Sequence, residues 1–131
     1  MCVATATDIS LASPALKRLG IIDYFEDIIT CNQLGIAKDD PAFFLETLKR
    51  IDTPIAETMV FEDALYAIKS AKAAGFTVAG VYDSSMEADS KKIASLVDIY
   101  LNSYDEWEMD RGLGLQRRSR YSGRYKNNNR P

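Results

Sequence analysis

The chain has 131 residues, and its 47% hydrophobic share is enough for one folded domain with a core. Residues 1–110 contain 9 basic and 19 acidic residues, a net charge of −10, which argues against nucleic acid as the main partner. The absence of histidine excludes Ser-His and Cys-His nucleophiles and the usual zinc sites. No apolar run approaches a membrane span and no basic signal-like start is present, so we expect a cytoplasmic protein without a membrane partner.

The first third of the chain predicts two strands. Residues 3–5 form a short apolar strand, and the small polar residues Thr5-Ala6-Thr7-Asp8 form a turn at its end. Ser13-Pro14 is typical of an N-cap with proline at the first helical position, and it predicts a short helix that closes at Gly20. Residues 27–30 are predicted to be a second strand, and residues 32–38 a loop.

The middle of the chain predicts a helix followed by a strand-to-helix unit. Asp40-Pro41 begins the helix, with an apolar side made of Phe43, Phe44, Leu45, Leu48 and Ile51. Residues 58–62 form a β-branched, apolar run that predicts a buried strand, and it ends in the adjacent carboxylates Glu62 and Asp63. A helical pattern over 64–74, closed by Gly75, follows at once.

The last elements continue the alternation of strand and helix. We expect a strand at 76–82, a helix from about 87 to 96 and a strand at 98–102, with Tyr104 to Trp107 closing the folded part. This order predicts parallel βαβ units with right-handed crossovers, in a three-layer α/β/α, Rossmann-like domain over residues 1–108. Residues 109–131 are basic and lack apolar periodicity, which predicts a disordered tail; binding of RNA or of a membrane surface is the alternative.

Three separated signals meet where parallel strands end. Thr5 ends the first strand, Lys38 precedes a helix, and Glu62-Asp63 ends the strand at 58–62. Hydroxyl and turn amide groups bind phosphoryl oxygens, lysine neutralises their charge, and carboxylates hold Mg²⁺. Each residue alone has an ordinary alternative: a strand-end hydroxyl bonded to nearby backbone, a solvated loop lysine, and an acidic helix start.

These stretches also carry a family resemblance. Residues 2 to about 107 resemble the carboxyl-terminal part of a haloacid dehalogenase (HAD) superfamily hydrolase of the beta-phosphoglucomutase and phosphoglycolate phosphatase type. The matching stretches are 3–7, 35–44, 60–68 and 71–75. The resemblance implies an enzyme for a small phosphorylated metabolite, in which Thr5 with the Ala6 turn contacts the phosphoryl group. It implies that Lys38 stabilises the charge of that group and of the nucleophile, and that Asp63, with Glu62, holds Mg²⁺.

The sequence departs from the family in one decisive respect. The family's nucleophile and acid/base are two aspartates in an Asp-x-Asp motif on a central strand, and no Asp-x-Asp occurs here. The helical cap that follows that strand is also absent. The missing strand would lie between residues 3–5 and 58–62, so these strands must pair directly or leave open edges. We therefore expect a truncated chain that is inactive alone. It would either pair with a separate amino-terminal fragment or self-associate through its open edges.

A second hypothesis accounts for the same residues without catalysis. In this hypothesis the chain is a remnant domain that keeps a phosphate and metal pocket for binding or regulation. Two smaller departures, Asp39 where the family usually has proline and Ala64 where serine is common, do not separate the hypotheses.

Overall fold

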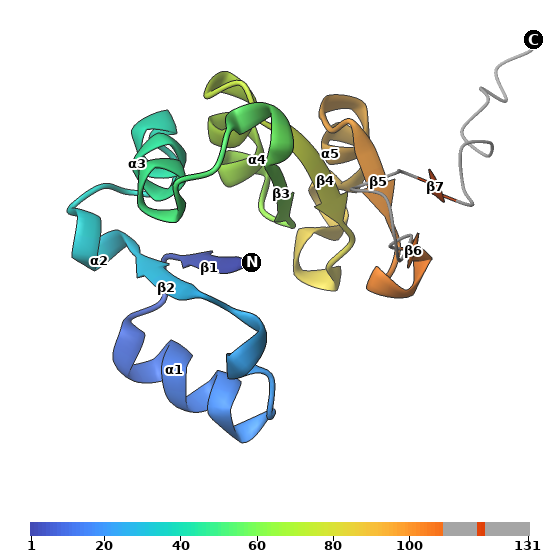
Figure 1. The fold of residues 1–131 in the computed structure, drawn as a ribbon. Helices are drawn as coiled ribbons and strands as arrows, with labels where there is room; N and C mark the ends of the chain where they lie inside the picture. The colour runs from blue at the N-terminus through green and yellow to red at the C-terminus, as the bar shows by residue number, and fades with distance from the viewer. Residues whose placement is uncertain (109–117, 120–131) are drawn as a thin grey trace, which may run out of the picture.

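The computed structural model describes residues 1–108 and 118–119, and it has the predicted α/β architecture (Figure 1). Strand and helix alternate along residues 1–101, as the sequence predicted. The strands are β1 (Cys2–Thr5), β2 (Asp27–Thr30), β3 (Met59–Glu62), β4 (Thr77–Val81), β5 (Ile99–Leu101), β6 (Trp107–Glu108) and β7 (Arg118–Ser119). The helices are α1 (Ile9–Arg18), α2 (Cys31–Leu34), α3 (Pro41–Ile51), α4 (Leu65–Ala73) and α5 (Ser90–Leu96). Short 3₁₀ turns are η1 (Ile22–Tyr24), η2 (Ile55–Glu57), η3 (Ser84–Asp89) and η4 (Tyr104–Glu106).

The sheet is divided into two parallel parts. β1 pairs with β2, with Thr5 opposite Thr30, while β3, β4 and β5 pair in that order, with Glu62 opposite Gly80. No ladder joins β1 to β3 in the described part of the chain, so each of these strands keeps one unpaired edge. Of the two expected arrangements, direct pairing of residues 3–5 with 58–62 is therefore wrong, and open edges are what the structure has.

Helices hold the two parts of the sheet together. Figure 1 shows α1 on one side of the β1–β2 pair and α3 on the other, with α4 against β3 and β4. The fully buried Phe43 of α3 and Ile68 of α4 belong to one core cluster, against which both Ala4 of β1 and Val60 of β3 pack. The α3–α4 layer thus spans the break that the strands leave open.

A second, smaller core lies on the opposite face of β3, β4 and β5. Its buried members are Ala79, Val81 and Leu101. The rings of Phe61 and Trp107 meet edge to face beside it, with centroids 5.1 Å apart. This contact attaches the segment after β5 to β3, so the carboxyl ends of these two strands are held close together.

The predicted start of the first helix is wrong. α1 begins at Ile9 and not at Ser13, because the Asp8 carboxylate accepts a hydrogen bond from the Ser10 amide and caps the helix earlier. Pro14 consequently lies inside the helix, where its missing N–H removes one backbone bond.

Two further boundaries differ from the prediction. Residues 31–34 form the short helix α2 and not a loop, because Thr30 and Gln33 make a reciprocal capping box, and Gly35 ends the turn at φ +66°. Residues 87–89 belong to η3, so α5 begins only at Ser90. On α3, Leu45 is exposed and not part of the buried side.

The predicted basic tail falls almost entirely on residues 109–117 and 120–131, which lie outside the described residues. Within the described part, none of the helices is long and apolar enough to cross a membrane.

Candidate active site

The candidate residues lie at the carboxyl ends of the strands. Thr5 is the last residue of β1, Glu62 is the last residue of β3, and Asp63 follows it directly. Lys38 comes from the segment between α2 and α3, so its position depends on the Gly35 turn and on the Asp40 cap of α3. In parallel α/β sheets this edge is where ligands bind.

A buried ion pair forms the centre of the site. The Lys38 ammonium lies 2.6 Å from Oε2 of Glu62, and the two side chains are only 14% and 5% exposed. The structure therefore brings together two residues that the sequence analysis had placed at one site from different segments. Removing both charged groups from water carries a desolvation penalty, and the attraction between the ammonium and the carboxylate offsets it.

The second carboxylate oxygen of Glu62 faces its own backbone. Oε1 accepts hydrogen bonds from the amides of Asp63 and Ala64, both at 3.1 Å. Ala64 is the N-cap of α4, so these two bonds hold the backbone that leads into the helix, and no side chain caps α4 itself. Both oxygens of Glu62 are thus engaged, and Glu62 holds Lys38 in place.

Asp63 is in a different electrostatic situation. Its carboxyl group is partly withdrawn from water, and this raises its pKa; a hydrogen bond with the Glu62 side chain and the negative charges of Glu62 and Asp83 raise the pKa further. In the described residues Asp63 has no ion pair. A carboxylate destabilised by negative neighbours fits a hard divalent cation, and Asp63 suits that role better than Glu62. No cluster of three metal-binding side chains occurs within residues 1–108.

Thr5 occupies the other half of the edge. Its hydroxyl oxygen accepts a hydrogen bond from the Thr7 amide at 3.0 Å, which closes the turn that contains the exposed Ala6. Asp8 continues this turn and accepts a second bond, from the Asn32 amide group at 2.9 Å. Thr5 thus makes the local backbone contact that was the ordinary alternative for it. Among the described residues, no hydrogen bond or ion pair links it with Lys38 or Asp63 across the β1–β3 break.

Sequence reasoning did not select Tyr104 as a site residue. Its ring lies against Phe61, with centroids 6.1 Å apart, at the end of the strand that carries Glu62. The residue is largely exposed, but partial withdrawal of its hydroxyl from water raises the pKa of Tyr104, and the charges of Asp63 and Glu62 raise it further. Its position just after the last parallel strand was the available signal, because all such strand ends share one edge.

Comparisons with known proteins show which family the sequence resembles. The family model of haloacid dehalogenase-like hydrolases matches residues 1–75. The chain is 31% identical over 81 residues to the fructose-1-phosphate phosphatase YqaB of Escherichia coli K12, which covers 62% of this chain and 43% of the relative. It is 32% identical over 102 residues to the beta-phosphoglucomutase of Bacillus subtilis 168, with 76% and 45% covered.

A solved structure shows the same similarity in three dimensions. A protein of Thermotoga maritima described as a beta-phosphoglucomutase superposes with a TM-score of 0.70 and 29% identity, covering 80% of this chain and 48% of that protein. The chain thus spans less than half the length of these relatives. The family model, the sequence relatives and the shared fold together show that the chain belongs to the haloacid dehalogenase-like hydrolase family.

Proposed function

We propose that this chain provides the phosphate-binding and metal-binding part of a phosphatase or phosphomutase site for a small phosphorylated metabolite. The observation that carries the proposal is the buried Lys38–Glu62 pair directly beside the uncompensated Asp63 carboxylate. A lysine held at one position and a carboxylate that favours a cation are what a transferring phosphoryl group requires, because its catalysis is mainly electrostatic. The relatives named for fructose 1-phosphate and beta-phosphoglucose chemistry support a phosphorylated sugar as the substrate class.

Each residue has a distinct task in this proposal. Lys38 neutralises charge on the phosphoryl oxygens, and Glu62 prevents that ammonium from moving into solvent. The Thr5 hydroxyl can still donate its hydrogen to a phosphoryl oxygen while its oxygen accepts from Thr7, and the exposed Ala6 turn offers a backbone amide. Asp63 would hold Mg²⁺, which supplies charge neutralisation and alignment of the phosphate when it is bound.

The sequence contains no Asp-x-Asp motif, so in this proposal residues outside it supply the nucleophile. The free edges of β1 and β3 favour an added parallel strand, because both present unpaired backbone groups and both pack on the same α3–α4 layer. We propose that an Asp-x-Asp strand, from a longer form of the protein or from a separate fragment, completes the sheet and the site. The chain alone then hydrolyses no phosphate ester.

Addition of a strand tests this proposal directly. A peptide with an apolar Asp-x-Asp sequence is added to the chain, and hydrolysis of p-nitrophenyl phosphate is measured with and without Mg²⁺. We expect Mg²⁺-dependent hydrolysis that is lost with an Asn-x-Asn peptide, with Asp63→Asn and with Lys38→Met. Binding of the peptide is verified separately by sedimentation.

The alternative function is binding of phosphate and metal without catalysis. The engagement of both Glu62 oxygens favours it, because Glu62 holds Lys38 in position without any contribution from a nucleophile. If the peptide binds but no hydrolysis appears, while phosphate or Mg²⁺ binding still depends on Lys38 and Asp63, this alternative is the better account. Hydrolysis by the chain without peptide would contradict both.

A further inference from the structure

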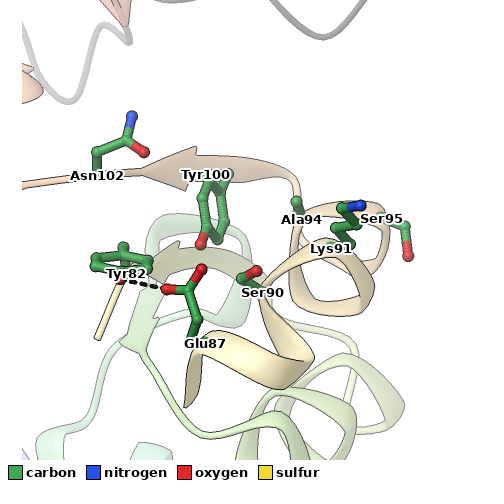
Figure 2. A pocket seen from close by; sticks show the side chains of 8 residues that line it. All are labelled: Tyr82, Glu87, Ser90, Lys91, Ala94, Ser95, Tyr100 and Asn102. Carbon is green, nitrogen blue, oxygen red and sulfur yellow. Dashed lines mark hydrogen bonds between the residues drawn. The ribbon is translucent and has the colours of Figure 1, made fainter. Parts of the chain in front are cut away.

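A pocket lies apart from the Lys38–Glu62 site. It has a volume of about 400 Å³ and is formed between α5, the end of β4 and strand β5 (Figure 2). None of Thr5, Lys38, Glu62 or Asp63 lines it. A volume of this size is within the range of pockets that hold small metabolites.

Polar groups and aromatic rings share the walls of this pocket. The Tyr82 hydroxyl donates a hydrogen bond to the Glu87 carboxylate. Figure 2 shows the Glu87 carboxylate, the Ser90 hydroxyl and the Tyr100 hydroxyl turned toward the same space, with Lys91 on the α5 side. The pocket therefore offers acceptors and donors together with two tyrosine rings.

The charges of the pocket restrict what can bind. Glu87 carries a negative charge that disfavours an anion, and Lys91 carries a positive charge that disfavours a cation. Neither residue forms an ion pair in the part of the chain that the structure describes, so the two charges do not neutralise each other. An ion of either sign thus meets one like and one opposite charge and gains little net attraction, whereas an uncharged ligand meets no repulsion and can hydrogen-bond to either group.

We propose that this pocket binds a neutral, polyhydroxylated ring, either a monosaccharide or a cyclic polyol. Ring hydroxyls can donate to Glu87 and accept from Lys91 and Ser90, and the C–H face of such a ring packs against tyrosine. This pocket shares no residue with the proposed phosphate site and requires no nucleophile, so its ligand binding can be tested independently of the proposed hydrolase function.

Titration of the ¹⁵N-labelled full chain, followed by NMR, tests the proposal with D-glucose and myo-inositol as probes. We expect millimolar, saturable shifts at the amides of Ser90, Lys91 and Tyr100, and none at Thr5. Lys91→Met should weaken binding about three- to tenfold, because one charge-assisted hydrogen bond is lost. Lys92→Met is the matched control, since Lys92 is exposed and does not line the pocket, and it should leave binding unchanged.

Three results would overturn the proposal. The first is the absence of pocket shifts with either neutral probe at hundred-millimolar concentration. The second is a stronger shift with inorganic phosphate than with the neutral probes, which would indicate an anion site. The third is equal weakening in the Lys91→Met and Lys92→Met chains. An unchanged spectrum for the β1–β2 residues verifies that each variant remains folded.

Discussion

Removal of Lys38 should destabilise the protein far more than removal of an ordinary surface lysine. The Glu62 side chain is 5% exposed, so Lys38→Met leaves a buried carboxylate without its counter-charge. Breaking a buried pair in this way costs about 3–5 kcal/mol, and the two backbone amides that remain on Oε1 favour a value of about 3 kcal/mol. This loss is a large fraction of the stability of a small domain.

The partner substitution should cost less. In Glu62→Gln the side-chain oxygen still accepts from the amides of Asp63 and Ala64, and Lys38, 14% exposed, can turn toward water. We expect a loss of about 1–2 kcal/mol, mainly one charge-assisted hydrogen bond. Because the single changes remove the same contact, the double variant should be more stable than their sum predicts by about 1–2 kcal/mol.

Equilibrium unfolding in urea of the wild type, Lys38→Met, Glu62→Gln and the double variant measures this coupling. The exposed Lys49–Glu46 pair on α3 is the matched control, and Lys49→Met with Glu46→Gln should show a coupling below about 0.5 kcal/mol. The reasoning is refuted if Lys38→Met costs no more than Lys49→Met, or if the losses at Lys38 and Glu62 simply add. Either result would mean that the pair is not formed in solution.

Three further predictions concern packing, a helix cap and the open edges. Gly80→Ala should lower the free energy of unfolding in urea by about 1–3 kcal/mol, because the new Cβ would lie 3.0 Å from Val97 Cγ1. The control Gly35→Ala brings its Cβ near no atom and is strained only by the φ of +66°. Equal losses of unfolding free energy in the two variants would contradict the packing argument. Hydrogen bonds from Ser10 lower the pKa of Asp8, so its contribution to stability is present above the ordinary carboxyl range and is lost as pH falls through the lowered pKa. The difference in thermal midpoint between wild type and Asp8→Asn should thus shrink in acid, and a constant difference would contradict this assignment. The free edges of β1 and β3 should cause self-association that rises with concentration in sedimentation velocity and falls when the Asp-x-Asp peptide is added; a monomer at every concentration would count against open edges.

The sequence predicted the parallel strands well because their apolar runs are short, β-branched and bounded by clear turn signals. It failed where a local hydrogen bond competes with a general rule. Pro14 suggested a helix start, but the Asp8 cap begins α1 earlier, and the reciprocal Thr30–Gln33 bonds convert an expected loop into α2. Such choices depend on side-chain geometry that composition and periodicity do not contain.

The candidate site was predictable to a similar degree. Strand ends and the resemblance brought Lys38 and Glu62 to one edge, and the structure has them in contact. The sequence did not reveal that Glu62 is fully engaged while Asp63 lacks a counter-charge, because that distinction depends on which oxygen faces which amide. For Tyr104 the sequence offered only its position after the last parallel strand, and the contact of its ring with Phe61 becomes visible only in the fold.

The divided sheet also determines how the molecule should open. β4 is paired on both sides, and its residues Val78 and Ala79 are fully buried, whereas β1 has one ladder partner and α1 has no buried residue. Amide hydrogens of β4 should therefore exchange with solvent only on global unfolding, while those of β1 exchange through a smaller opening. The half that carries Thr5 can then detach and return while the half that carries Asp63 stays folded.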